Sequence, residues 1–149
     1  KMIRKYRPKI VLCNAIDDRH IDHGKGSKLV SDACFLSGLR RIETVLDGQI
    51  QDAYRPEVVY HYIQWKNIEP DFVVDVSDFI HIKKQAVLAY SSQFYDPNST
   101  EPVSPIATKT FLESIDYRAR DLGRLIFKDF AEGFTVERTL AINSLDDII

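Results

Sequence analysis

The stretch Asp17-Asp18-Arg19-His20-Ile21-Asp22-His23-Gly24 decides how the fold is interpreted. It follows an apolar run at residues 10–13 and precedes a segment with helical spacing, which we expect from Ser27 to Leu39. The cluster is therefore expected where a strand ends and a helix begins, and ligands bind at such points in open α/β sheets. Two histidines three residues apart can point into one cleft, and neutral imidazole is a good zinc ligand.

The same stretch has a plainer interpretation. A turn rich in Asp, Arg, His and Gly is equally typical of a solvated loop. Zinc takes three protein ligands in a catalytic site or four in a structural one, whereas this stretch offers two histidines. The pattern taken alone predicts either an exposed loop or part of a metal site, in which Asp22 accepts an N–H from one imidazole ring and fixes its tautomer.

Composition narrows the class of protein. The chain has 149 residues with 44% hydrophobic and 28% charged side chains, which is typical of one soluble globular domain. The net charge is −2 and there is no basic block, so we do not expect nucleic acid as a partner. No apolar run reaches the roughly 18 residues of a membrane helix and no signal peptide is visible, so we expect a cytoplasmic protein with no membrane partner. Cys13 and Cys34 lie in apolar surroundings and are expected to be buried, reduced thiols.

Strand-like and helix-like segments alternate along the chain. This alternation predicts an α/β, layered fold with a mostly parallel sheet. We expect strands at 9–14, 57–64 and 71–76, helices at 77–93 and 108–130, a late extended segment at 135–142 and an irregular excursion at 40–56. Three strands are few for such a sheet, and residues 1–8 are typical of the end of a helix. We therefore expect the sequence to be the later part of a longer protein whose N-terminal strands are missing here.

The segment Arg7–Val11 followed by Asp17–His23 resembles the second motif of the LmbE/PIG-L-like zinc-dependent deacetylases. The resemblance continues through Lys28–Val30, Ala89–Phe94 and Ala131–Phe134, and it covers most of the chain. These enzymes remove the acetyl group from N-acetylglucosamine-containing substrates. The likeness is greatest to the branch that deacetylates N-acetylglucosaminyl malate in bacillithiol biosynthesis. The resemblance implies a Rossmann-like fold, of which residues 1–149 form the C-terminal two-thirds of one deacetylase domain.

The resemblance also implies a zinc cofactor and residue roles. The family binds zinc through a His and an Asp of an N-terminal His-Pro-Asp-Asp motif and through the last histidine of the second motif, which is His23 here. The earlier histidine, His20, would stabilise or protonate the tetrahedral intermediate, with Asp22 supporting it. Position 21 is usually Pro in this motif and is Ile here.

Two arginines are candidates for binding substrate carboxylates, because a guanidinium can bind a carboxylate bidentately. Arg19 lies beside the histidines in the sequence. The resemblance implies that Arg55 corresponds to an arginine of the deacetylase family that can reach the site of a neighbouring subunit. Each is also compatible with a simple surface charge. The family implies a homo-oligomer, and hexamers occur in it.

The first motif is the main departure from the family, since no His-x-Asp-Asp occurs in the 149 residues. We expect a zinc-dependent N-deacetylase acting on a small N-acetylglucosaminyl substrate in the full-length protein, and an inactive chain when these residues stand alone. The alternative is a non-catalytic sugar-binding or assembly module. A generic Rossmann-like domain with a structural zinc or nucleotide site is a weaker hypothesis, because no Gly-x-Gly-x-x-Gly pattern is present.

Overall fold

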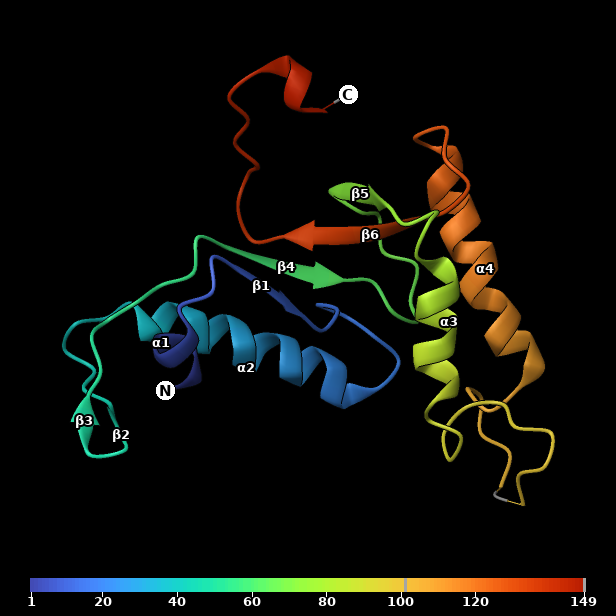
Figure 1. The fold of residues 1–149 in the computed structure, drawn as a ribbon, viewed down its shortest axis with the longest axis horizontal. Helices are drawn as coiled ribbons and strands as arrows, with labels where there is room; N and C mark the ends of the chain where they lie inside the picture. The colour runs from blue at the N-terminus through green and yellow to red at the C-terminus, as the bar shows by residue number, and fades with distance from the viewer. Residues whose placement is uncertain (101, 149) are drawn as a thin grey trace. The chain divides into compact units, whose positions relative to one another are not determined.

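The computed structural model describes residues 1–100 and 102–148 (Figure 1). The chain forms two compact units. The first contains Lys1–Asp71 and the chain from Phe134 onward, and the second contains Phe72–Gly133. Across residues 1–100 and 102–148, no helix has both the length and the apolar character needed to cross a bilayer.

The first unit is built around three strands: β1 (Ile10–Cys13), β4 (Val58–Tyr62) and the second half of β6 (Ala131–Val136). β1 pairs in parallel with β4, and β4 pairs antiparallel with β6. Two helices, α1 (Met2–Tyr6) and α2 (Ile21–Ser37), belong to the same unit, as does a short 3₁₀ helix at Leu145–Ile148. The α/β class is confirmed, although the pairing is more mixed than the mostly parallel sheet that we expected, because β6 runs against β4.

Helix α2 begins at Ile21, earlier than the predicted start at Ser27. The His20 side chain caps the helix by accepting the Asp22 N–H at 3.2 Å, so the helix starts inside the acidic-histidine stretch. Gly24 and Gly26, which precede the predicted helix, lie in its first turns. At Gly26 an added Cβ would come within 3.2 Å of Asn14 Oδ1, so the glycine lets α2 approach the end of β1.

The segment at residues 40–56, which we predicted to be irregular, contains a small β-hairpin that the sequence analysis missed. Its strands are β2 (Val45–Leu46) and β3 (Gln49–Ile50), paired antiparallel. Asp47 and Gly48 join them with φ values of 52° and 79°. Asp-Gly is a strong signal for a two-residue hairpin turn with two positive φ values.

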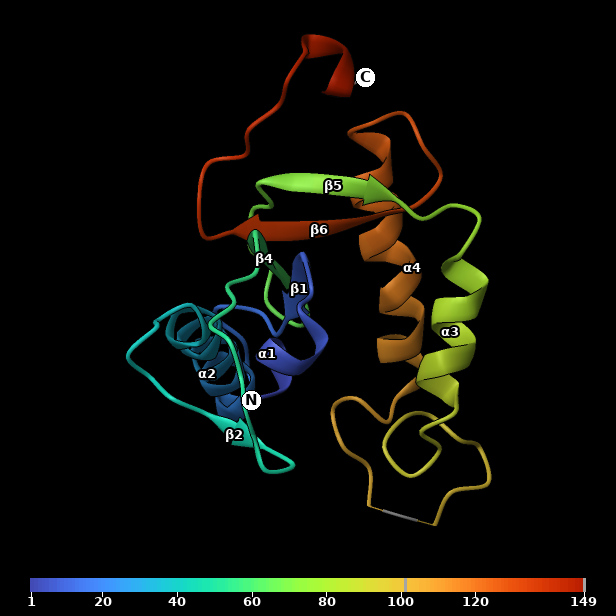
Figure 2. The same cartoon turned by 60° about the vertical axis from the view of Figure 1, so that its left-hand side comes forward.

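The second unit contains β5 (Phe72–Asp75), the start of β6, α3 (Ile80–Leu88) and α4 (Lys109–Arg124). The two helices lie side by side in both views (Figures 1 and 2), joined by an ion pair between Lys84 and Asp116 at 2.7 Å. The Thr108 side chain caps α4 by accepting the Phe111 N–H at 3.1 Å, as the predicted helix start requires.

Both helices of this unit are shorter than predicted. Ser77 does not cap α3, because its hydroxyl donates to Asp75 Oδ1 at 2.6 Å and accepts the Phe130 N–H at 3.1 Å. α4 ends at Arg124 rather than Phe130, and Phe127 just beyond it has a positive φ of 57°. The late strand β6 begins at Ala131, before the predicted start of the extended segment at residue 135.

Candidate functional site

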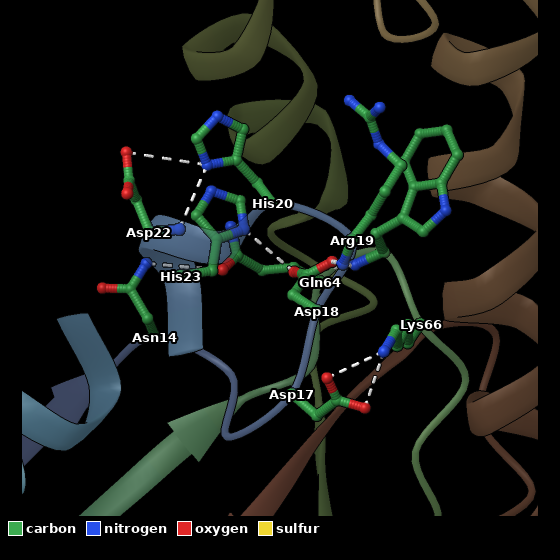
Figure 3. Close-up of polar contacts among 10 residues, drawn as sticks. Asn14, Asp17, Asp18, Arg19, His20, Asp22, His23, Gln64 and Lys66 are labelled. Atoms are coloured by element: carbon green, nitrogen blue, oxygen red, sulfur yellow. Dashed lines mark hydrogen bonds and ion pairs between the residues drawn. The ribbon is translucent and has the colours of Figure 1, made fainter. Parts of the chain in front are cut away.

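The acidic-histidine stretch lies at the carboxyl end of β1 and forms the first turn of α2 (Figure 3). His20 is the N-cap of the helix and His23 is on its first turn, so the two rings face the same region. Their centroids are 5.4 Å apart, with 35° between the ring planes. The structure thus brings together the two histidines that the spacing predicted, and both side chains are accessible to solvent, at 54% and 35%.

Asp18 holds one of these histidines in place. Its side chain is fully buried, and Oδ2 lies 3.0 Å from His23 Nδ1. The other carboxylate oxygen accepts the Arg19 N–H at 2.5 Å, and Oδ2 also accepts the Trp65 N–H at 3.3 Å. Burial acts to raise the pKa of Asp18, but the hydrogen bonds from His23 and from these two N–H groups outweigh it, and the pKa is below its ordinary value.

This arrangement fixes the tautomer of His23. An ionised carboxylate can only accept, so Nδ1 of His23 carries the proton and Nε2 presents its lone pair outward. A carboxylate that orients a histidine in this way is the usual support for a metal-bound imidazole. The sequence analysis assigned a supporting carboxylate to Asp22 and missed Asp18, whose role depends on burial that no local pattern reveals.

Asp22 lies beside the other histidine. Its backbone N–H donates to His20 Nδ1 at 3.2 Å, and its carboxylate is 3.8 Å from the same atom (Figure 3). The carboxylate is 72% exposed, so this contact is loose. Because Nδ1 of His20 accepts a hydrogen bond, the neutral ring carries its proton on Nε2, opposite to the tautomer of His23.

The loop after β4, residues 64–66, closes against the turn. Lys66 Nζ is 2.7 Å from both carboxylate oxygens of Asp17, and the Trp65 N–H reaches Asp18. Figure 3 shows this loop beside the histidine-bearing turn. These contacts therefore hold the loop and the turn together.

The two candidate arginines lie in different places. The Arg19 guanidinium is 4.9 Å from the centre of the Trp65 ring, on the loop that contacts the histidine-bearing turn. Arg55 lies over the Phe35 ring at 4.4 Å and donates to the Phe35 carbonyl at 2.9 Å, near the C-terminal end of α2. A helix of 17 residues is about 25 Å long, so within one chain Arg55 is far from the histidines. Its contribution to a neighbouring subunit stays a prediction.

The metal-binding capacity of the site is partial. His23 Nε2 is oriented for one bond to zinc, and Asp18 supplies the supporting hydrogen bond. Within the described residues, no three His, Cys, Asp or Glu side chains gather as a metal-binding group. The described residues therefore provide one zinc ligand, His23, and residues elsewhere would have to provide the others.

A second histidine network lies beneath the turn, and the sequence analysis did not single it out. His61 of β4 is 3% exposed, with Nε2 3.0 Å from Glu137 Oε1. Its Nδ1 is 3.0 Å from the Asn14 carbonyl, 2.9 Å from Ser27 Oγ and 3.2 Å from Cys13 Sγ. The network ties the ends of β1 and β6 to α2, and thereby supports the turn above it.

No protein-family model matches the chain. Among solved structures, it is similar to the conserved protein TT1542 from Thermus thermophilus, with 30% identity over 95% of this chain and a TM-score of 0.76. The N,N'-diacetylchitobiose deacetylase from Pyrococcus horikoshii gives 18% identity over 99% of this chain and a TM-score of 0.69. GalB, the 4-carboxy-2-hydroxymuconate hydratase from Pseudomonas putida, gives 15% over 97% and a TM-score of 0.67.

The chain shares the fold of these proteins. It spans 58%, 53% and 58% of their respective lengths. The expected α/β deacetylase-like fold is confirmed by this likeness. Because a deacetylase and a hydratase share the fold, the fold does not select the reaction, and the chemistry must be argued from the site.

Proposed function

We propose that this chain carries part of the active site of a zinc-dependent N-acetylglucosaminyl deacetylase of the LmbE/PIG-L-like family. The observation that carries the proposal is the hydrogen bond from His23 to the buried carboxylate of Asp18, beside His20, at the carboxyl end of β1. The residues form the C-terminal two-thirds of one catalytic domain. Activity requires the protein that also supplies the remaining zinc ligands and the general base.

His23 would hold zinc through Nε2. When bound, the metal would polarise the amide carbonyl of the substrate and lower the pKa of a bound water to about 7. Asp18 keeps the imidazole in the tautomer that leaves Nε2 free. Its burial and its three hydrogen bonds keep that orientation fixed without further reorganisation.

His20 is the hydrogen-bond donor of the site. Its neutral ring carries the proton on Nε2, from which it can stabilise a developing oxyanion. The Asp22 carboxylate lies 3.8 Å from Nδ1, and the Asp22 N–H donates to the same nitrogen. Loss of such a donor costs on the order of 100- to 1,000-fold in kcat.

The proposed substrate is N-acetylglucosaminyl malate, processed in the cytoplasm. It is supported by Arg19, which directly precedes His20 in the sequence and whose guanidinium, held over Trp65, can bind a carboxylate. We propose a homo-oligomer, such as a hexamer, in which Arg55 reaches the site of a neighbouring subunit. Within its own chain, Arg55 lies at the C-terminal end of α2, away from the histidines.

The test is release of free amine by the natural protein that contains this chain, supplied with zinc and N-acetylglucosaminyl malate. His23→Ala should abolish both zinc-dependent activity and bound zinc. His81→Ala is the matched control, because His81 is an exposed histidine on α3, and it should leave both unchanged. Full activity in the His23 variant would overturn the proposal.

A second candidate is a non-catalytic sugar-binding or assembly module. It is favoured by the finding that residues 1–100 and 102–148 hold no three-residue metal-binding group. This candidate predicts saturable binding of the sugar conjugate by the natural protein with no amine release at any zinc concentration. Amine release that depends on His23 would exclude it.

A further inference from the structure

The guanidinium of Arg19 has no polar partner among the described residues, although three acids lie near it in the sequence. Both carboxylate oxygens of Asp17 are bound by Lys66 at 2.7 Å. The Asp18 carboxylate is bound by His23 and by backbone N–H groups. The only contact found for the guanidinium within residues 1–100 and 102–148 is with the Trp65 ring, at 4.9 Å. The N–H groups of Arg19 are therefore left for a ligand.

Trp65 holds this guanidinium without consuming its hydrogen-bonding capacity. A guanidinium over an aromatic ring is attracted through its face, and the N–H groups at its edge stay available for a carboxylate, which they bind bidentately. Lysine could not combine the two contacts in the same way, because its ammonium is a point charge without a planar fork.

The position of Trp65 is itself fixed relative to the histidines. Its backbone N–H donates to Asp18, the same carboxylate that orients His23. The adjacent Lys66 fastens the loop to Asp17. The backbones of Trp65 and Arg19 and the imidazole of His23 are therefore held by one buried carboxylate, which fixes the loop that carries the indole ring relative to the turn that carries Arg19.

We propose that Trp65 is a positioning residue that holds Arg19 as the receptor for a carboxylate on the substrate. The site then selects N-acetylglucosamine conjugates with an acidic substituent over neutral ones. This inference rests on the proposed deacetylase function for its reaction, whereas anion binding at Arg19 can be measured without it.

Anion binding can be followed directly, because Trp65 is the only tryptophan of the chain. L-malate is the probe and its uncharged diamide is the matched control. We expect a saturable change in tryptophan emission with L-malate that the diamide, and sodium chloride at equal ionic strength, do not produce. Arg19→Gln should abolish the change, whereas Arg40→Gln, which removes an exposed arginine outside the turn, should preserve it. An unchanged response in Arg19→Gln, or the same response to chloride, would overturn the inference.

The role of Trp65 is tested by calorimetric titration of the variants with L-malate. Trp65→Ala should weaken binding about two- to fivefold, as expected for an exposed cation–π contact, and Trp65→Phe should retain most of the affinity. In the Arg19→Gln background the Trp65→Ala change should have no further effect, because the two residues act through one contact. Equal weakening in both backgrounds would show that Trp65 does not act through Arg19. Circular dichroism confirms that each variant is folded.

Kinetics of the natural protein separate this inference from the proposed function. Trp65→Ala should raise KM for the malate conjugate more than it lowers kcat, and should affect a neutral N-acetylglucosaminide less. Absence of amine release from both substrates, with malate binding intact, would remove the deacetylase proposal and keep the anion receptor. Amine release with the same preference between the two substrates in Arg19→Gln and wild type would keep the deacetylase and remove the receptor.

Discussion

Asp18 is the residue on which the geometry of the histidine turn depends. Its carboxylate joins the imidazole of His23 to the backbone of Arg19 and Trp65, so one buried group fixes the turn, the facing loop and the tautomer of that imidazole. Hydrogen bonds to a charged group contribute about 1.5–3 kcal/mol each and are costly to leave unpaired. The site therefore depends on a residue that does not itself face the solvent.

Asp18→Asn should lower the free energy of unfolding by about 1–3 kcal/mol at pH 7, measured by urea denaturation. The pKa of Asp18 is lower in the folded protein than its ordinary value, so the stabilisation from its ionised form is present above about pH 4 and is lost as the pH falls through the folded pKa. The difference between wild type and variant should accordingly shrink in acid. Asp17→Asn, which breaks an exposed ion pair, should cost only about 0–1 kcal/mol. Equal losses in the two variants would contradict this account.

The cysteines illustrate a second residue-scale effect. Both thiols are buried and free, as predicted from their apolar surroundings. Burial, with smaller contributions from Glu137 and Cys34, raises the pKa of Cys13 to about 11. Because the thiolate is the reactive form, neither Cys13 nor Cys34 should react with a thiol reagent at pH 8 in the folded protein, and both should react in urea. Rapid labelling of the folded protein would show that the thiols are accessible.

At this scale the sequence predicted the pair His20 and His23 but not the carboxylate that matters most. The spacing of the two histidines is visible in the chain, and so is the preference of such clusters for the end of a strand. Which of three neighbouring acids is buried depends on how residues 64–66 fold back on the turn, and those residues are more than forty positions away. The Arg19–Trp65 contact was hidden for the same reason.

Among the elements, α2 connects the site to the rest of the first unit. Its first turn carries the histidines, and its C-terminal end is held by Arg4 of α1, which is 5% exposed. The Arg4 guanidinium donates to three carbonyl groups and one hydroxyl, at Ser37, Leu39, Ile42 and Thr44, over distances of 2.7–2.9 Å. These bonds join α1 to the last residue of α2 and to the segment that follows it.

Arg4→Met should lower the free energy of unfolding by about 3 kcal/mol, because four hydrogen bonds from a buried guanidinium are lost at once. Lys5→Met is the matched control, since the neighbouring lysine is exposed, and it should change stability by less than about 0.5 kcal/mol. Urea denaturation at pH 7 measures both. A similar loss for the two variants would show that the Arg4 network does not stabilise α2.

The types of the long elements were predictable, whereas several boundaries were not. β1, β4 and β5 lie within the predicted strands because their apolar, β-branched residues leave little choice. The start of α2 was predicted too late, at Ser27, because glycine is a poor helix former, although Gly24 and Gly26 lie in this helix and Gly26 packs closely against Asn14. Ile21, where proline is usual in the resembling motif, is the first helical residue, and proline is well tolerated there.

For the whole molecule, the exposed apolar surface of the first unit is the notable property. β1 is hydrogen-bonded to β4 and to no other strand of the described chain, which leaves its other edge unpaired. Ile10 and Leu12 of β1 are 56% and 58% exposed, and Leu29 and Phe35 of α2 are 71% and 57% exposed. An unpaired edge with apolar side chains favours association with another strand or chain.

The 149-residue chain should therefore self-associate, with a mass above 17.2 kDa in light scattering after gel filtration. Leu12→Lys should shift it toward the monomer, because a charge on an edge strand opposes further pairing. Ile82→Lys, which places the same charge on an exposed apolar position of α3, should not. A monomeric wild-type chain, or equal dissociation by both variants, would contradict this expectation.

The central claim is that the turn presents Nε2 of His23 as a metal ligand and the Nε2–H of His20 as a hydrogen-bond donor. The most direct test is a long-range ¹H–¹⁵N correlation spectrum of the histidine side chains at pH 8, where ordinary histidines are neutral. The account predicts opposite tautomers, with the proton on Nδ1 of His23 and on Nε2 of His20. A His23 ring protonated on Nε2, or two rings that both average between tautomers as free histidine does, would contradict it.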